Sequence, residues 1–294
     1  MRTIVIGSRG SDLALWQANH VKDELEILGH SVRIEVIKTQ GDRIQHLSFD
    51  KLEGKGFFTK EIEEALLNNT VDLAVHSHKD LETTPPDKLV IGAVSERAHP
   101  SDILLISKEC VDTSQKWNLR EGGTVGTSSA RRQVQVRYHR PDCQLLDLRG
   151  NVPTRIQKLL DGQYDAILLA KAGVDRLELD LSDLEVFVMD PEEFVPAPAQ
   201  GVLGLQIREG DGFMAEIMNG INSLETKARI DQERLILNRL EGGCQLPLGA
   251  YCDEAGIMHV AYAKDKDSQC QYFQFKPSEY AAGVDDIVRT LEAS

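Results

Sequence analysis

The feature that most constrains the fold is a local pattern that occurs twice in the chain. In each copy a short apolar run leads into glycine and hydroxyl residues, an arginine and the start of a helical stretch; the copies are residues 7–11 and 126–131. Around both copies, strand-like runs alternate with helical periodicity, which predicts a largely parallel sheet covered by helices. We therefore expect an α/β fold with two similar lobes and a central cleft, and ligands beyond the carboxyl ends of the strands.

Hydrophobic periodicity places the individual elements. Apolar residues at positions 14, 18, 21, 25 and 28 recur at helical steps, so they predict a helix that Gly29 would end. Thr59 is a possible N-cap of the next helix. Helices are expected at residues 61–67, 223–240 and 286–291, and strands at 4–6, 32–36, 73–75, 145–146, 166–169, 201–207 and 260–263, with a further strand ending at Val125.

The domain organisation follows from a break in this alternation. Prolines at positions 191, 196 and 198 interrupt the pattern near residues 190–200. We predict three domains, which is reasonable for 294 residues. Residues 1–97 with 197–217 form the first α/β lobe, residues 98–196 the second, and residues 218–294 a small α+β domain.

The composition narrows the class of protein. A net charge of -14 and a pI near 5.0 argue against a nucleic-acid partner. No apolar run approaches the roughly 20 residues of a membrane-spanning helix, and the N-terminal residues read as a strand without a signal-peptide core. Five cysteines without a CxxC pair predict neither a disulfide framework nor a zinc site. We expect a cytoplasmic protein, and a monomer because no coiled coil or interface stripe is evident.

Arginines are concentrated in one short stretch of this acidic chain. Between residues 131 and 155 there are six arginines and no lysine. A guanidinium group gives two parallel hydrogen bonds to a carboxylate or phosphate, so the stretch predicts a small polyanionic ligand. Arg137 and Arg140 are expected on a solvated helix face. Arg131, Arg132 and Arg149 lie just after predicted strand ends, beside glycine and serine, and are therefore candidates for binding. Arg155 is a further candidate.

Charged residues also follow the buried strand at residues 73–75. Lys79 and Asp80 could form a surface ion pair, which contributes little, but their position at a strand end favours a catalytic role. His76 and His78 share one face of the strand and could suggest a metal. No third ligand with suitable spacing is nearby, so no metal site is expected.

A cysteine and a long polar segment complete the candidates. Cys244 lies in a Gly-Gly-Cys-Gln loop that would leave its sulfur accessible, which permits nucleophilic chemistry or covalent attachment. An inert buried cysteine is the alternative. Residues 41–60 are long, polar and glycine-containing, as in a mobile lid. Neither a GxxxxGK[ST] nor a GxGxxG motif occurs, so nucleotide binding has no support.

Taken in order along the chain, these segments resemble the porphobilinogen deaminase (hydroxymethylbilane synthase) family. Each motif alone is weak, but the ordered set is specific and covers the chain from residue 4 to about 252. The matching segments are GSRGS at 7–11, LALWQ at 13–17, GKGFF at 54–58, HSHKD at 76–80, GTSSARRQ at 126–133, LRGNV at 148–152, PAPAQG at 196–201 and LEGGCQLPLG at 240–249.

The resemblance implies a fold and an activity. Such enzymes have three α/β domains, the first two similar to type II periplasmic binding protein lobes. They condense four porphobilinogen molecules head to tail, with release of ammonia, on a dipyrromethane cofactor. That cofactor is linked by a thioether to the cysteine matching Cys244, and every ring of the growing chain carries acetate and propionate groups, which explains the arginines.

The resemblance also implies residue roles. Asp80 would be catalytic. Lys79, Ser129, Arg131, Arg132 and Arg155 would hold the cofactor. Arg9, Ser11, Arg149, Arg155 and Arg176 would bind substrate carboxylates, and Lys55 and Phe58 would belong to the lid. The chain departs from the usual family pattern at His78, Leu81 and Glu82, after or within the catalytic motif, and at Gln40.

Two other classes of protein remain as alternatives. A non-catalytic, two-lobed binder of polycarboxylates would share the lobes and the arginines, but the Gly-Gly-Cys loop in an extra domain and the missing signal peptide speak against it. An RNA-binding protein would need aromatic platforms and a basic surface. Porphobilinogen is therefore the expected partner, with neither nucleic acid nor membrane.

Overall fold

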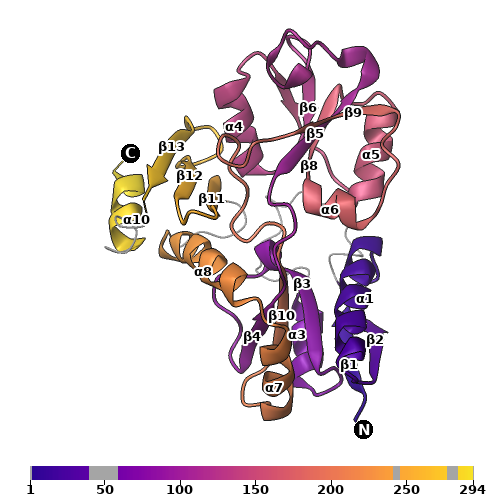
Figure 1. The fold of residues 1–294 in the computed structure, drawn as a ribbon. Helices are drawn as coiled ribbons and strands as arrows, with labels where there is room; N and C mark the ends of the chain where they lie inside the picture. Colours follow the sequence, from indigo (N-terminus) through magenta and orange to yellow (C-terminus); the bar gives the residue numbers. More distant parts are fainter. Residues whose placement is uncertain (1, 40–58, 241–245, 277–283, 294) are drawn as a thin grey trace. The chain divides into compact units, whose positions relative to one another are not determined.

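The computed structural model describes residues 2–39, 59–240, 246–276 and 284–293, which form two compact units. One unit consists of Met1–Arg97 with Val202–Lys227, and the other of Ala98–Gly201 with Ala228–Ser294 (Figure 1). No described helix is both long and apolar enough to cross a membrane. The division into three domains with the boundaries given above stays a prediction.

The first unit is built on a five-stranded sheet in the order β2-β1-β3-β10-β4. Strands β1 to β3 run parallel, whereas β10 is antiparallel to both β3 and β4. The strands are β1 (Ile4–Ser8), β2 (Val32–Val36), β3 (Leu73–Ser77), β4 (Leu89–Val94) and β10 (Leu203–Arg208).

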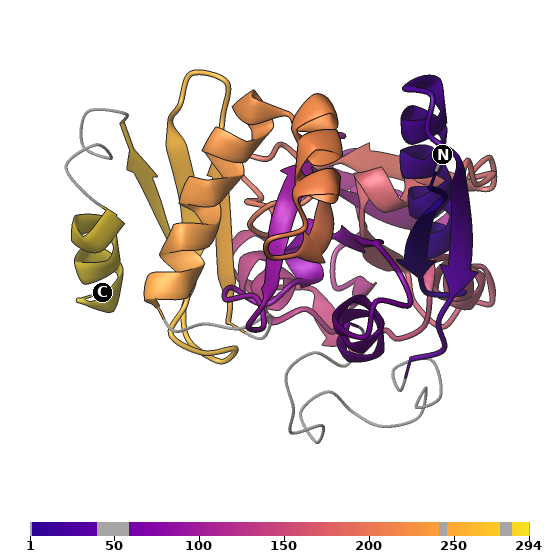
Figure 2. The same ribbon diagram turned by 90° about the horizontal axis from the view of Figure 1, so that it is seen from below.

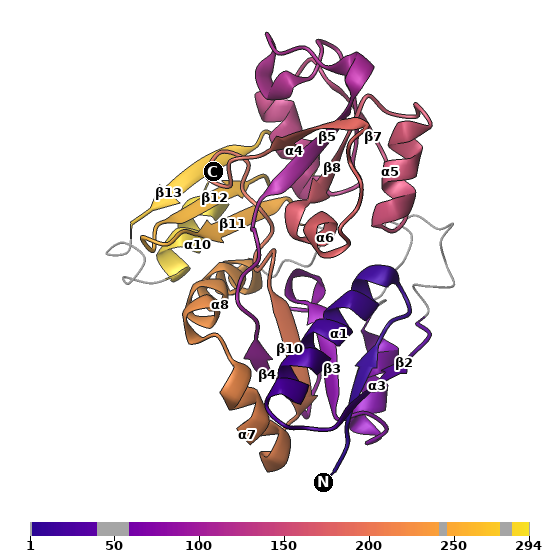
Figure 3. The ribbon, with the colours of Figure 1, turned by 45° about the vertical axis from the view of Figure 1, so that its right-hand side comes forward.

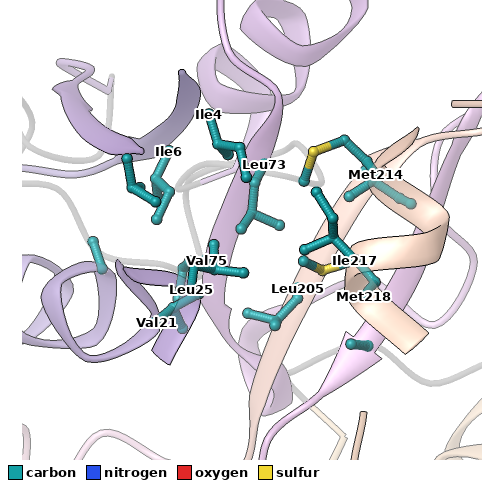
Figure 4. Packing of buried hydrophobic residues seen from close by; sticks show 14 of the residues in the cluster. Ile4, Ile6, Val21, Leu25, Leu73, Val75, Leu205, Met214, Ile217 and Met218 are labelled. Carbon is teal, nitrogen blue, oxygen red and sulfur yellow. The ribbon is translucent and has the colours of Figure 1, made fainter. Parts of the chain in front are cut away.

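Helices cover both faces of this sheet. Helices α1 (Asp12–Ile27) and α7 (Gly212–Ile221) share one core with the strands, and α3 (Lys60–Leu67) packs on the other face. Figure 4 shows the first core, where side chains from α1 and α7 meet those of the central strands. The predicted α1 is confirmed. Thr59 precedes α3 as expected, but its hydroxyl donates to Glu63 at 3.3 Å rather than capping a backbone N–H.

The second unit contains a sheet of the same design, in the order β7-β6-β8-β5-β9. Its parallel strands are β6, β7 and β8, and β5 is antiparallel to both β8 and β9. The strands are β5 (Asp102–Ser107), β6 (Thr124–Gly126), β7 (Gln144–Leu146), β8 (Ala166–Ala170) and β9 (Leu184–Val188).

Alternate residues of β5 explain how this sheet is covered. Leu104 and Ile106 join the core beneath α4 (Ala130–His139), whereas Ile103 and Leu105 join the core beneath α5 (Val152–Leu160) and α6 (Lys171–Arg176). Successive strand residues point to opposite faces, so a strand covered on both sides is apolar throughout. Figure 3 shows α4 and α5 on opposite sides of the strands.

A small antiparallel sheet completes the second unit. It contains β11 (Leu248–Cys252), β12 (Met258–Tyr262) and β13 (Gln271–Phe275). The carboxyl-terminal part of α8 (Leu224–Arg239) and α10 (Val284–Glu292) pack against it around one core (Figure 2). A separate cluster joins β12 to α4.

The two five-stranded sheets correspond strand for strand. The strands β2, β1, β3, β10 and β4 take the places of β7, β6, β8, β5 and β9, and in both sheets the fourth strand is antiparallel to its neighbours. The repeated sequence motif follows β1 in one sheet and β6 in the other, which are equivalent strands. The expected α/β class, with two similar lobes and a small carboxyl-terminal sheet, is confirmed.

Candidate functional site

In the first unit, four predicted residues lie at one edge of the sheet. β1 and β3 are paired parallel neighbours, so the segments that follow them leave the same edge. Arg9 and Ser11 follow β1, and Ser11 is the N-cap of α1, accepting a hydrogen bond from Ala14 N at 3.4 Å. Lys79 and Asp80 follow β3 in the 3-10 turn η2 (His78–Asp80), where Asp80 is exposed and Lys79 half-buried. The structure therefore brings these four residues to a common edge.

A buried polar network lies directly behind this edge. His76 Nε2 is 3.1 Å from Gln206 Oε1, and Gln206 Nε2 donates to Glu63 Oε1 at 3.1 Å. Burial lowers the pKa of His76 to about 4; the Gln206 hydrogen bond opposes this shift, and the positive charge of Arg9 adds to it. His76 is therefore neutral at pH 7, and its Nε2 can donate the hydrogen bond to Gln206. Burial raises the pKa of Glu63.

In the second unit, the predicted residues lie at the equivalent edge. Ser129 is the N-cap of α4, after β6, and Arg131 and Arg132 occupy the first turn of that helix. Arg149 follows β7, and Arg176 ends the helix α6 that follows β8. Because β6 is paired in parallel with both β7 and β8, these segments leave the sheet on the same side.

The two adjacent arginines are bound to one buried carboxylate. Arg131 Nη1 donates to Asp102 Oδ2 at 2.7 Å, and Arg132 Nη2 donates to Asp102 Oδ1 at 2.8 Å. The side chains of the arginines are 6% and 7% exposed and that of Asp102 is 0% exposed. Both arginines are among the residues predicted from the sequence, whereas Asp102 is not. The sequence feature that could have identified Asp102 is its position, as an acidic residue, directly before the apolar run at 103–106.

The remaining arginines of this edge are held by main-chain contacts. Arg155 Nε donates to Gly150 O at 2.7 Å, and Lys158 Nζ donates to Arg149 O at 3.0 Å. These bonds fix the turn from β7 into α5, where Gly150 has a φ of 119°. Arg176 Nη2 donates to Gly201 O at 2.9 Å. Burial lowers the pKa of Arg176 to about 10, partly offset by a neighbouring carboxylate, and the group remains a cation at pH 7.

For one arginine of the cluster the predicted environment is wrong. Arg140 is buried at 4% exposure rather than solvated, and its side chain pairs with Asp142 at 2.7 Å. It also donates to the carbonyl groups of Lys116, Leu119 and Arg120, so it closes a loop of the second unit. Arg137 is exposed as expected, and its Nη1 donates a hydrogen bond to the carbonyl oxygen of Lys266, between β12 and β13.

Several predicted residues lie outside the described part of the chain. They are Cys244, Lys55, Phe58 and Gln40. The four cysteines that the structure does describe have free thiols. Burial raises the pKa of Cys110 to about 11, of Cys143 to about 11 and of Cys270 to about 12, so these thiols are protonated at neutral pH and poor nucleophiles.

Two further features of the second unit lie apart from the predicted residues. One is a group of Glu192, Asp253 and His259 whose ligand atoms lie within 4.8 Å of one another and could hold a metal ion. Asp253 Oδ2 and His259 Nε2 already form a hydrogen bond of 3.1 Å, so that pair is satisfied without an ion. The other is a pocket of about 260 Å³ between the turn η4 (Lys116–Asn118) and residues 187–194, which none of the predicted residues lines.

Fold and site together define a class of protein: an α/β protein with two topologically equivalent sheets, each placing cationic and hydroxyl side chains at the carboxyl ends of its parallel strands. A family model described as "Porphobilinogen deaminase, dipyromethane cofactor binding domain" matches residues 4–216. The chain belongs to the porphobilinogen deaminase family.

Curated relatives agree with this assignment. A porphobilinogen deaminase of Nitratidesulfovibrio vulgaris (strain DP4) is 44% identical over 87% of this chain and 80% of the relative. One of Gloeobacter violaceus is 43% identical over 86% of this chain and 77% of the relative. Among solved structures, an ancestral cationic amino acid solute-binding protein covers 81% of this chain and 90% of its own, with 14% identity and a TM-score of 0.43. The Bordetella pertussis BvgS periplasmic VFT2 domain covers 77% of this chain and 91% of its own, with 13% identity and a TM-score of 0.45.

Proposed function

We propose that this protein is a hydroxymethylbilane synthase. It condenses four porphobilinogen molecules head to tail, releasing ammonia at each step, on a dipyrromethane primer attached to Cys244. The observation that carries the proposal is the family match over residues 4–216. The cationic side chains at the sheet edges support it, because substrate and product both carry several carboxylates.

The described residues are chemically suited to the cofactor. A dipyrromethane with acetate and propionate groups needs several fixed cationic donors. Arg131 and Arg132 supply two buried guanidinium groups, and Arg132 Nε is buried without an acceptor among the described residues. An orphaned buried donor is costly, and a ligand carboxylate would satisfy it. Lys79, Ser129 and Arg155 are proposed to contribute the other contacts to the cofactor.

The substrate would be held by a second set of cations. When bound, the cofactor supplies the pyrrole carbon to which the first substrate unit is joined. Around it, side chains of this chain are proposed to bind the substrate carboxylates and so to orient the incoming ring. These side chains are Arg9, Ser11, Arg149, Arg155 and Arg176.

Asp80 is the proposed catalytic group. Loss of ammonia from porphobilinogen leaves an azafulvenium cation, which a carboxylate beside the pyrrole nitrogens would stabilise. The same carboxylate could accept and return protons during the condensation. Its position in the turn after β3, exposed and free of the core, suits both tasks. Lys55 and Phe58 are proposed to belong to a lid that keeps water from the cation.

The first experiment is the intact mass of the denatured protein, followed by an ammonia assay with porphobilinogen. The expected mass exceeds the 32.7 kDa chain by two pyrrole units, and the excess is absent from Cys244→Ala but present in Cys143→Ala. Reversible binding of porphobilinogen without ammonia release would instead indicate the non-catalytic binder. We also propose that the enzyme is a cytoplasmic monomer; light scattering after size exclusion should give the mass of one chain.

A further inference from the structure

Asp102 stands at the centre of a buried hydrogen-bonded cluster in the second unit. Besides Arg131 and Arg132, its carboxylate accepts a third hydrogen bond, from Gln200 Nε2 to Oδ1 at 2.9 Å. Gln200 also donates to Pro100 O at 2.7 Å and is itself fully buried. One carboxylate therefore receives three donors from two segments that are distant in sequence.

The geometry of the arginine pair depends on this carboxylate. Arg131 and Arg132 are adjacent in α4, and adjacent helical side chains point about 100° apart. Their guanidinium groups nevertheless converge on one acceptor. Each group has one more anchor, since Arg131 Nη1 donates to Val195 O at 2.9 Å and Arg132 Nη1 donates to Leu168 O at 3.0 Å. Neither carbonyl carries a charge, so of the groups described above as bound by the pair, Asp102 is the one whose charge offsets the repulsion between the two cations.

The charges of Asp102, Arg131 and Arg132 also indicate that this cluster binds an anion. Burial by itself would raise the pKa of Asp102, but the charges and hydrogen bonds of Arg131 and Arg132 outweigh burial and hold that pKa well below its ordinary value. The carboxylate is therefore ionised at neutral pH. Among the described side chains that form ion pairs in this cluster, two buried guanidinium groups share one buried carboxylate, which leaves a net positive charge. A further anion would neutralise it.

We infer that Asp102 is a positioning residue for the Arg131–Arg132 pair. It holds the two guanidinium groups side by side so that their remaining donors, Arg132 Nε among them, are oriented before a carboxylate of the dipyrrole arrives. The inference rests on the proposed function, because it takes the dipyrrole as the ligand of the pair. It predicts that loss of Asp102 impairs loading of the primer while the fold remains.

The test compares Asp102→Asn with Asp165→Asn. Asp165 is a matched control: its carboxylate also accepts from an arginine, Arg120 at 2.8 Å, and from Thr124 N at 2.8 Å, and it is not among the proposed site residues. Both proteins are purified from the same host, and the loaded fraction is read from the intact mass. Circular dichroism and melting temperature report the fold.

We expect Asp102→Asn to be folded yet to carry roughly tenfold less attached dipyrrole, because the displaced guanidinium groups bind its carboxylates less well. In the loaded fraction kcat should fall by about tenfold or more, since the primer is held in the wrong place, with a smaller change in the KM for porphobilinogen, which other side chains bind. Asp165→Asn should have a lower melting temperature but load normally. A folded Asp102→Asn protein with a wild-type loaded fraction and kcat would overturn the inference.

A milder variant keeps the inference testable if Asp102→Asn does not fold. Gln200→Leu removes one of the three donors to Asp102 without touching either arginine, and it should lower loading in the same direction by a smaller factor. Unchanged loading in this variant would overturn the inference. If the proposed function itself is wrong, the wild type and Asp165→Asn will also lack the dipyrrole and release no ammonia, so the two failures are distinguishable.

Discussion

The backbones of Ala98 and Gly201 are in direct contact. Ala98 N donates to Gly201 O at 3.1 Å, and a Cβ atom on Gly201 would lie 2.6 Å from the carbonyl oxygen of Ala98. Gly201 also has a φ of 92°, which disfavours other residues. These two residues are where the chain enters and leaves the first part of the second unit. Glycine is thus required at position 201 both by close approach and by its backbone conformation.

Replacing Gly201 by alanine should destabilise the protein strongly. Gly29 provides the control, because it has a φ of 88° but nothing within 4 Å of the added Cβ. Gly29→Ala should lower the free energy of unfolding only by the cost of placing alanine in a left-handed conformation, about 1–2 kcal/mol. Gly201→Ala adds a clash with backbone, for a total of roughly 2–5 kcal/mol. Urea unfolding monitored by circular dichroism measures both; equal losses would contradict the argument from close approach.

Asp80→Asn should lower the rate of catalysis without destabilising the fold. Asp80 is exposed and lies outside the buried cores, so its replacement should leave the melting temperature within about 1 °C of wild type, since surface substitutions change stability little. The asparagine cannot neutralise a cation or accept a proton, so kcat should fall by at least about a hundredfold. Asp87→Asn, an exposed control in the same connecting segment, should retain full activity. Near-normal turnover of Asp80→Asn would exclude its catalytic role.

Arg149→Leu should weaken substrate binding. Removing one partner of a charged hydrogen bond costs about 1.5–3 kcal/mol, which corresponds to a rise in KM of roughly 10- to 150-fold. Arg137→Leu is the matched control from the same arginine-rich stretch, since Arg137 is exposed on α4 and is not assigned to the site. Steady-state kinetics with porphobilinogen distinguish the two, and equal KM values in both variants would remove Arg149 from the proposed site.

His76 should make stability depend on pH. Its pKa is about 4 in the folded protein and about 6.5 when unfolded, so between these values the unfolded chain binds a proton that the folded protein does not. Stability should therefore fall as pH drops from about 6.5 to 4, by about 3 kcal/mol in total from this group. Below pH 4 the contribution should level off.

The measurement is urea unfolding at a series of pH values. His76→Gln keeps a hydrogen-bonding group beside Gln206 but does not titrate, so its pH dependence should be weaker than that of the wild type by this amount. An unchanged slope in His76→Gln would show that this histidine is not buried in its neutral form.

Much of the fold could be predicted from local patterns. The periodicity of α1, the alternation in β2 and the glycine-hydroxyl-arginine motifs after β1 and β6 all correspond to observed elements. β5 was missed because its run of apolar residues has no alternation, and only the sheet around it explains why both of its faces are buried. Arg140 was assigned wrongly because a charged helical residue is usually solvated, and the carbonyl groups that it binds come from residues 116–120.

The sequence by itself determined the α/β class and the family, and it supplied the candidate site residues, because periodicity and ordered motifs can be recognised without knowledge of tertiary contacts. Only the tertiary structure decided which groups meet. Arg131 and Arg132 were evident as arginines, but their partner Asp102 lies 29 and 30 positions earlier in the chain. That pairing depends on β5 entering the sheet antiparallel between β8 and β9, which sets the start of β5 beside the end of β8 and beneath α4. Strand pairing joins segments far apart in the sequence, and the apolar run of β5 does not by itself show which strands it pairs with.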